Sequence, residues 1–124
     1  MQTLNLTKED AEKIFAIKAV LEKHYHRRYT HQDLAQMVGT NESRLRVGFK
    51  QIVNKTISDY LSEVRMEKVK EMLENSDLSL KVIAIRVGLD RSNLLRCFKK
   101  FTGCTPRQWR NNIRKNGVYR YANS

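Results

Sequence analysis

An internal repeat constrains the fold of this chain more than any other feature of its sequence. When residues 34–65 are aligned with residues 83–114 without a gap, nine of 32 positions are identical. Ordinary residue usage would give roughly two identities by chance over this length. A repeat this short indicates one supersecondary unit used twice. The identical pairs are Ala35/Ala84, Val38/Val87, Gly39/Gly88, Ser43/Ser92, Leu45/Leu94, Phe49/Phe98, Lys50/Lys99, Thr56/Thr105 and Arg65/Arg114.

Helix signals recur along the chain, and no segment has the alternating pattern of a strand. A single proline and five glycines among 124 residues leave few helix breakers. Thr or Ser with an acidic or amide residue three positions later marks several helix starts, beginning with Thr7 and Asp10. We therefore predict an all-α fold of about seven helices, in which two helix-turn-helix lobes are joined by a long linker helix. The expected divisions are 1–56 (N-terminal helix and first lobe), 57–75 (linker helix), 76–115 (second lobe) and 116–124 (frayed tail).

Each copy of the repeat has the pattern of a helix-turn-helix. A short helix beginning after Thr30 should end at Gly39, which can adopt the left-handed backbone of a sharp turn. Ala35, four residues earlier, is small enough for two helices to cross closely. The second copy repeats this arrangement with Ala84 and Gly88. In the N-terminal helix that precedes the first copy, the expected apolar stripe is Ala11, Ile14, Phe15, Val20 and Leu21.

The second helix of each copy has one apolar and one polar face when 100° is allowed per residue. Leu45, Phe49 and Ile52 should face inward in the first copy, as should their counterparts Leu94, Phe98 and Phe101 in the second. A polar, basic face of small residues suits a helix that enters a major groove and presents donors to base edges. The residues expected to point outward are Ser43, Val47 and Lys50, flanked by Arg44, Arg46 and Gln51, and Ser92, Arg96 and Lys99, flanked by Asn93 and Lys100.

The positive charge is concentrated in the second half of the chain. The formal net charge is +11, yet residues 1–80 hold 13 Lys or Arg against 12 Asp or Glu. Residues 81–120 hold 11 Lys or Arg and one acid, Asp90. A segment this basic indicates a polyanionic partner, either nucleic acid or an anionic surface.

Three strings in the sequence carry a resemblance to the DNA-binding region of the AraC/XylS transcription-regulator family. They are DLAQMVGTNESRLRVGFK, YLSEVRMEKVKEMLENSDLSL and VIAIRVGLDRSNLLRCFKKFTGCTPRQWR, and the similarity runs from about Ile14 to Arg114. The resemblance implies two helix-turn-helix lobes joined by a rigid helix, with one monomer reading two successive major grooves. A linker helix of about 17 residues would span roughly 25 Å. Adding the width of the two lobes gives an expected recognition-helix spacing near one DNA turn, ~34 Å.

The chain departs from the family pattern at two places. The family commonly carries Arg where this chain has Val47, whereas Arg96 keeps the arginine in the second lobe. Val47 offers only apolar contact, for instance to a thymine methyl group. The turn from Gly88 to Ser92 also looks one residue shorter than the family's usual form.

These arguments predict two groups of DNA contacts. The residues expected to read bases are Ser43, Arg44, Arg46, Val47, Ser92, Asn93 and Arg96. Phosphate contacts are expected beside the recognition helices, where helix N-termini and cations can hold an anion. The expected phosphate contacts are Lys50, Thr56, Lys99, Lys100, Thr105 and Arg107.

The expected function is sequence-specific binding of double-stranded DNA by a cytoplasmic, nucleoid-associated transcription regulator. RNA polymerase is an expected partner, and a sensor domain could belong to a longer chain. The sequence contains no nucleophile–base pair, Gly-rich phosphate loop or spaced carboxylate dyad, so we expect neither catalysis nor a cofactor. The histidine spacing favours surface residues over a metal site, and no apolar run is long enough to span a membrane. Two alternatives remain: an RNA- or anionic-surface-binding module, and a protein-interaction domain.

Overall fold

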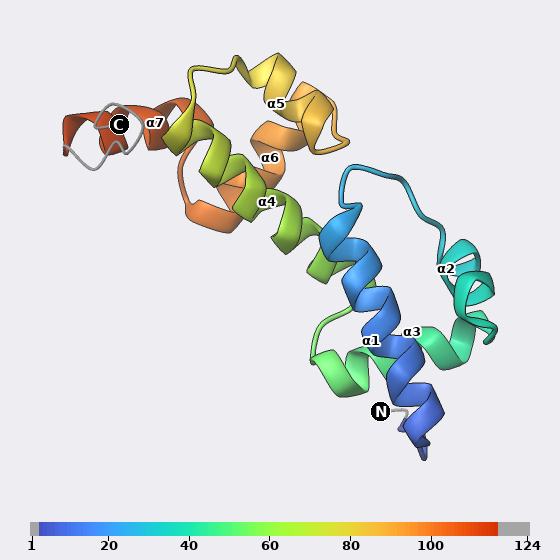
Figure 1. The fold of residues 1–124 in the computed structure, drawn as a ribbon. Coiled ribbons are helices and arrows are strands. Elements are labelled where there is room, and N and C mark those ends of the chain that lie inside the picture. Colours follow the sequence, from blue (N-terminus) through green and yellow to red (C-terminus); the bar gives the residue numbers. More distant parts are fainter. Residues whose placement is uncertain (1–2, 117–124) are drawn as a thin grey trace. The chain divides into compact units, whose positions relative to one another are not determined.

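Seven α-helices make up residues 3–116, the part of the chain that the computed structural model describes, and no strand occurs among them (Figure 1). This confirms the all-α prediction. The expected tail lies outside the described residues except for Asn116, which caps the last helix. No helix in the described range is long and apolar enough to cross a membrane. The helices are α1 (Lys8–Lys23), α2 (His31–Val38), α3 (Glu42–Val53), α4 (Ile57–Asn75), α5 (Leu80–Arg86), α6 (Arg91–Thr102) and α7 (Pro106–Lys115).

Side-chain caps fix where these helices begin. Thr7 and Thr30 form capping boxes with Asp10 and Asp33, in which the hydroxyl accepts from one backbone N–H and the carboxylate accepts from the other. Each cap satisfies N–H groups that have no partner within the helix. The other capping side chains accept a hydrogen bond from a backbone N–H three residues later; they are Asn41, Thr56, Ser79, Asp90 and Thr105.

The chain divides into two compact units inside α4, between Leu61 and Ser62. Unit one comprises residues 1–61 and contains α1 to α3. Unit two comprises residues 62–124 and contains most of α4 together with α5 to α7.

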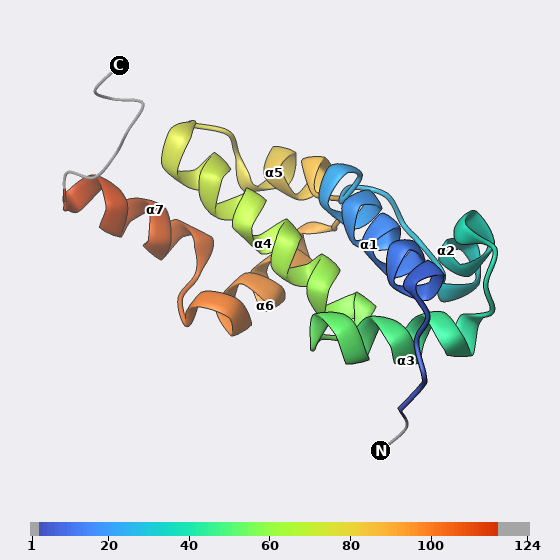
Figure 2. The same ribbon diagram turned by 60° about the horizontal axis from the view of Figure 1, so that its bottom comes forward.

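In unit one, α1, α2 and α3 pack against one another around a single core (Figure 2). The prediction for Phe15 was wrong, because this side chain is 54% exposed. The buried stripe of α1 follows the spacing i, i+3, i+7, which places Ile17 inward and turns Phe15 about 200° away from it. The core consists of Ile14, Ile17, Leu21, Leu34, Ala35, Leu45, Phe49 and Ile57.

In unit two, α4 supplies the supporting helix, and its Met66, Val69 and Leu73 are all buried. They accompany buried residues of α5 and α6, among them Ile83, Ala84, Leu94 and Phe98. The inward placement expected for Phe101 was wrong, because its side chain is 39% exposed. The ring lies near the end of α6, where the Lys70 ammonium group is 5.8 Å from its centroid. The Lys70 ammonium group thus lies over the face of the exposed Phe101 ring, a cation–π arrangement.

The structural repeat includes a helix that the sequence comparison did not reveal. Buried residues of α1 recur in α4 at an interval of 52 residues: Ile14/Met66, Ile17/Val69 and Leu21/Leu73. The helix-turn-helix copies themselves are 49 residues apart. The difference arises because seven residues connect α1 to α2, whereas four connect α4 to α5. Each unit is therefore a supporting helix followed by a helix-turn-helix.

Both turns of the helix-turn-helix motifs have the predicted backbone. Gly39 and Gly88 lie at φ 71° and 77°, in the left-handed region that favours glycine. After each turn, a backbone N–H donates a hydrogen bond to the carbonyl of the alanine that occupies the same position in both copies of the repeat. Thr40 N–H donates to Ala35 O at 3.0 Å, and Leu89 N–H donates to the Ala84 carbonyl at 2.9 Å.

Candidate nucleic-acid interface

Helix α6 presents the outer face that its sequence predicts. Ser92, Arg96, Lys99 and Lys100 are exposed, whereas Leu94 and Phe98 on the opposite side are fully buried. The core therefore fixes the rotation of α6 about its axis. The Asp90 side chain caps α6 and accepts a hydrogen bond from one backbone N–H group of its first turn.

A chain of hydrogen bonds orients Arg96 on this face. The Asp90 carboxylate accepts from the Asn93 backbone N–H at 2.7 Å and from the Asn93 side-chain amide at 2.9 Å. Asn93 Oδ1 in turn accepts from Arg96 Nη2 at 2.7 Å. The arginine is thereby held along the first two turns of α6, and its guanidinium retains the planar donor geometry that suits the edge of guanine.

Helix α3 presents a narrower outer face than predicted. Ser43, Arg46 and Lys50 are exposed, but Val47 is only 8% exposed, so the expectation that it faces directly outward was wrong. Arg44 and Gln51 flank Val47 on the helix, and both are bonded to the segment before α1. The chain before α1 therefore lies against part of that side of α3, and the exposed basic residues of the outer face are Arg46 and Lys50.

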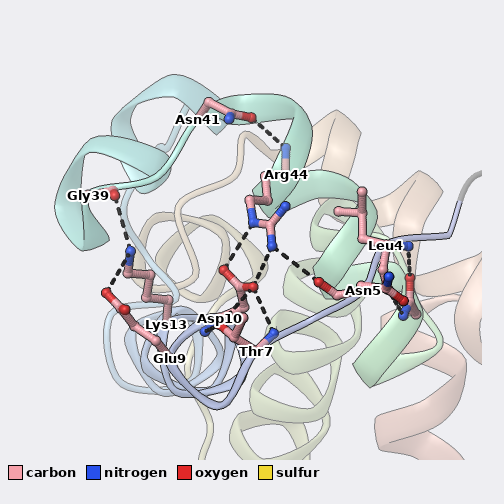
Figure 3. Close-up of polar contacts among 10 residues, drawn as sticks. Leu4, Asn5, Thr7, Glu9, Asp10, Lys13, Gly39, Asn41 and Arg44 are labelled. Atoms are coloured by element: carbon pink, nitrogen blue, oxygen red, sulfur yellow. Dashed lines mark hydrogen bonds and ion pairs between the residues drawn. The ribbon is translucent and has the colours of Figure 1, made fainter.

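Arg44 does not lie on the outer face, which corrects its expected position. Its Nε and Nη2 atoms donate to the two carboxylate oxygens of Asp10, at 3.0 and 2.5 Å, and Nη2 also donates to the Asn5 carbonyl at 3.3 Å (Figure 3). Hydrogen bonds from Arg44, followed by those from Thr7, hold the pKa of Asp10 well below its usual range. The hydrogen bond to Asp10, followed by the negative charge of its carboxylate, raises the pKa of Arg44. Arg44 therefore braces α3 against α1.

Lys13 adds a second brace between α1 and the first helix-turn-helix. Its ammonium group donates to the Gly39 carbonyl at 3.2 Å, directly at the turn, and lies 3.4 Å from Glu9 (Figure 3). The turn that sets the angle between α2 and α3 is thus tied to the supporting helix.

An open depression of about 530 Å³ lies beside the outer face of α3. Buried Val47 and Ile57 contribute apolar surface, whereas Arg46 and Lys50 contribute positive charge. Such a surface offers both an apolar contact and phosphate or base-edge donors. The depression is lined by Thr3, His31, Arg46, Val47, Lys50, Gln51, Thr56, Ile57 and Ser58.

The structure places the predicted phosphate contacts at helix starts and on exposed surface. Thr56 and Thr105 are half-buried, and their hydroxyls accept hydrogen bonds from the N–H groups of Asp59 and Gln108, both at 3.1 Å. Their oxygens thus serve as caps, so anion contacts would come from neighbouring backbone N–H groups. Lys50, Lys99, Lys100 and Arg107 are exposed.

A second depression, of about 410 Å³, brings further cations beside Arg107 in unit two. The sequence reasoning did not select Lys81 or Arg91, which are exposed and line this depression with Arg107. Both lie at the first turn of a helix in the basic half of the chain, a signal that could have identified them.

Arg110 has a structural role that the sequence reasoning missed. Its guanidinium donates to the carbonyl groups of Leu73 at 3.1 Å, Ser76 at 3.0 Å and Leu78 at 2.9 Å, with a longer bond to Met72 O at 3.4 Å. These carbonyls belong to the end of α4 and the loop after it, where a cation also interacts favourably with the helix dipole. Arg110 therefore fastens α7 to α4.

Equivalent aromatic pairs support α3 and α6 from behind. Phe49 packs edge-to-face on Tyr60 at 5.9 Å, and Phe98 packs in the same way on Trp109 at 5.8 Å. A lysine lies over each outer ring: Lys18 is 5.5 Å from the Tyr60 centroid, and Lys70 is 5.1 Å from that of Trp109. Burial, followed by the nearby Glu22 carboxylate, raises the pKa of Tyr60.

Within the described part of the chain, no group of three or more His, Cys, Asp or Glu side chains is placed to hold a metal ion. The cysteines Cys97 and Cys104 are both free thiols.

Comparison with known proteins gives a consistent set of relatives. A family profile described as "Helix-turn-helix domain" matches residues 34–112. The Msm operon regulatory protein of Streptococcus mutans is 29% identical over 101 residues, which cover 81% of this chain and 36% of that protein. The HTH-type transcriptional activator RhaR of Cronobacter sakazakii is 40% identical over 70 residues, covering 56% of this chain and 25% of that protein. The chain thus spans well under half the length of these relatives.

Solved structures share the fold over most of the chain. The C-terminal domain of the two-component response regulator yesN from Fusobacterium nucleatum superposes with a TM-score of 0.73 at 31% identity, covering 77% of this chain and 95% of that one. The C-terminal domain of AraT, a response regulator from Geobacillus stearothermophilus, gives 0.78 at 26% identity, with 81% and 84% covered. The DNA-binding domain of AdpA in complex with a target DNA gives 0.80 at 21% identity, with 84% and 95% covered, and shares the same fold.

Proposed function

The chain belongs to the AraC/XylS type of helix-turn-helix proteins, a family of sequence-specific DNA-binding transcription regulators, and we propose that it reads double-stranded DNA with α3 and α6 in two successive major grooves. The observation that supports this most strongly is the repetition of one motif within one chain. Both copies have a left-handed turn glycine, a fully buried Leu and Phe, and an exposed basic outer face.

On α6 we assign base reading to Arg96, with Ser92 and Asn93 beside it. Arg96 is exposed and already oriented by Asn93. A bidentate contact from arginine to guanine contributes ~1–3 kcal/mol of discrimination against other bases. The surrounding positive charge of unit two favours close approach to the duplex.

On α3 we assign base reading to Arg46 and Ser43, which are both exposed. Val47 lies in the adjacent depression, where a thymine methyl group could meet its apolar surface. Arg44 is assigned to bracing, since its guanidinium is bonded to Asp10 and to the Asn5 carbonyl.

Phosphate contacts are assigned to the exposed cations around both recognition helices. Backbone N–H groups after Thr56 and Thr105, at the starts of α4 and α7, would supply neutral donors. These contacts fix the register of the protein on the duplex without reading its sequence. The assigned cations are Lys50, Lys99, Lys100 and Arg107, to which the structure leads us to add Lys81 and Arg91.

The whole regulator would act in the cytoplasm, at the nucleoid, by binding rather than by catalysis and without a cofactor. Its relatives are much longer than this chain, so a sensor domain in a longer protein is consistent with the comparison. RNA polymerase is the proposed partner once the DNA site is occupied.

Selection of bound sequences from random duplexes tests this proposal, followed by competition between the selected and a scrambled duplex at fixed salt. We expect a monomer to protect about two helical turns, with contact centres ~10 bp apart. Equal competition by the scrambled duplex or by RNA would favour an anionic-surface module that uses only the charge of unit two. Failure of every duplex to bind would favour a protein-interaction domain.

A further inference from the structure

The segment before α1, residues 3–6, is bonded directly to the recognition helix α3. Leu4 N–H donates to Gln51 Oε1 at 2.8 Å, and Gln51 Nε2 donates to the Leu4 carbonyl at 2.9 Å. One side chain thus satisfies both backbone groups of a residue 47 positions earlier. We call residues 3–6 the N-terminal segment.

Two further contacts hold the N-terminal segment against α3. The Asn5 carbonyl accepts from Arg44, which also binds Asp10 at the start of α1. Leu6 packs against the core of unit one, close to Gly48. A Cβ atom at Gly48 would lie 3.4 Å from Leu6 Cδ2 and 2.7 Å from Ile14 Cδ1, so the absence of a side chain permits this close approach.

The contacted residues form a single stripe along α3. Arg44, Gly48 and Gln51 follow the spacing i, i+4, i+7, so they share one side of the helix. The reading residue Ser43 lies about 100° from Arg44 around the same helix. Contacts along this stripe therefore limit how far α3 can rotate about its axis, and a rotation would move Ser43, Arg46 and Lys50 together.

Within residues 62–116, the part of unit two that the structure describes, no segment is bonded to α6 in this way. The positions that correspond to Arg44, Gly48 and Gln51 are Asn93, Cys97 and Lys100. Asn93 bonds to Arg96 within α6 and to the N-cap residue Asp90. The half-site read by α6 thus provides an internal control for any effect of the N-terminal segment.

We propose that the N-terminal segment positions α3 for base reading and that Gln51 is the positioning residue through which it acts. This inference rests on the proposed function. In this role Gln51 orients Arg46 and Ser43 and does not contact a base itself. Removing the contact should loosen α3 and weaken discrimination at every base pair that α3 reads.

Gln51→Met is the first test, because methionine keeps the length and flexibility of glutamine and removes its hydrogen bonds. The affinity of the full chain is measured for every single-base variant of its selected duplex. We expect discrimination to fall by roughly 2- to 10-fold across the α3 half-site, the range for loss of an orienting hydrogen bond. Preferences in the α6 half-site should not change. Gln36→Met, at an exposed position of α2, is the matched control.

Leu4→Pro separates positioning from direct reading, since proline lacks the N–H that Gln51 binds while Gln51 itself stays intact. Positioning predicts the same pattern of loss as Gln51→Met, and no further loss when the two changes are combined. A Gln51→Met effect confined to one base pair, or unchanged preferences in Gln51→Met, would overturn the inference. If Leu4→Pro fails to fold, the number of base pairs in the α3 half-site that Gln51→Met affects still distinguishes positioning from direct reading.

The two levels of the proposal fail in different ways. A wild-type chain with no sequence preference would defeat the proposed function. If the wild-type chain selects a duplex but Gln51→Met loses discrimination equally in both half-sites, the proposed function stands and the positioning role is refuted.

Discussion

Arg96→Ala should remove the strongest single element of sequence reading in this chain. Arg96 lies at the centre of the exposed face of α6, and Asn93 Oδ1 accepts a 2.7 Å hydrogen bond from its Nη2 atom. The remaining donors of the guanidinium fork can then meet guanine with little loss of side-chain freedom. A contribution of ~1–3 kcal/mol corresponds to roughly 5- to 150-fold in relative affinity.

The assay is relative affinity across all single-base variants of the selected duplex at one salt concentration. Arg96→Ala should relax preference at one or two base pairs of the α6 half-site and leave the α3 half-site unchanged. Arg96→Lys keeps the charge and loses the planar fork, so it should lose nearly as much discrimination while retaining affinity for scrambled DNA. Full discrimination by Arg96→Lys, or equal losses in both half-sites, would refute the assignment.

Further outcomes follow from the phosphate contacts, the turns and the bracing ion pair. Lys99→Ala or Arg107→Ala should weaken binding to all duplexes alike and reduce the slope of log affinity against log salt by about 1; a changed base preference with an unaltered slope would contradict this. Gly39→Ala should lower the free energy of unfolding by about 1–2 kcal/mol, because alanine is strained at φ 71°; an unchanged urea midpoint would argue against it. The depressed pKa of Asp10 means that its pairing with Arg44 stabilises the fold above the unfolded pKa of about 3.9. That stability should be lost as pH falls below about 4, so the stability difference between the wild type and Asp10→Asn should shrink there; a difference independent of pH between 7 and 2 would contradict the linkage.

Local signals account for the parts of the fold that could be predicted from the sequence. The capping box of Thr30 with Asp33 and the left-handed turn at Gly39 depend on residues three or four positions apart, so short patterns identify them. The inward Leu94 and Phe98 follow from the helical period alone. These features gave the helix-turn-helix motifs and the outer face of α6.

Long-range contacts account for the parts that could not be predicted. Helical periodicity places Val47 on the outward face of α3 and Arg44 on its flank, and both were therefore expected to read bases. The position of Arg44 depends on Asp10, and the contact made by the neighbouring Gln51 depends on Leu4; both partners are more than 30 positions away and follow no spacing rule. Periodicity can orient a helix toward its core, but it cannot show that a distant segment covers part of the other face.

The relation between α1 and α4 escaped detection for a different reason. Only Lys18/Lys70, Leu21/Leu73 and Glu22/Glu74 are identical between the two helices at the 52-residue interval. A core position accepts apolar residues of similar size, so Ile14 and Met66 can play one role without sequence identity.

The packing of Trp109 gives the second unit an optical signal of its own. Trp109 is the only tryptophan in the chain. Its indole N–H donates to Glu74 Oε2 at 3.1 Å, and its ring contacts both Phe98 and the Lys70 ammonium. Its fluorescence therefore reports the environment of unit two alone, whereas far-ultraviolet circular dichroism sums the helices of both units. During unfolding, coincident curves from the two probes would indicate one cooperative transition, and separated curves would show that the units melt independently.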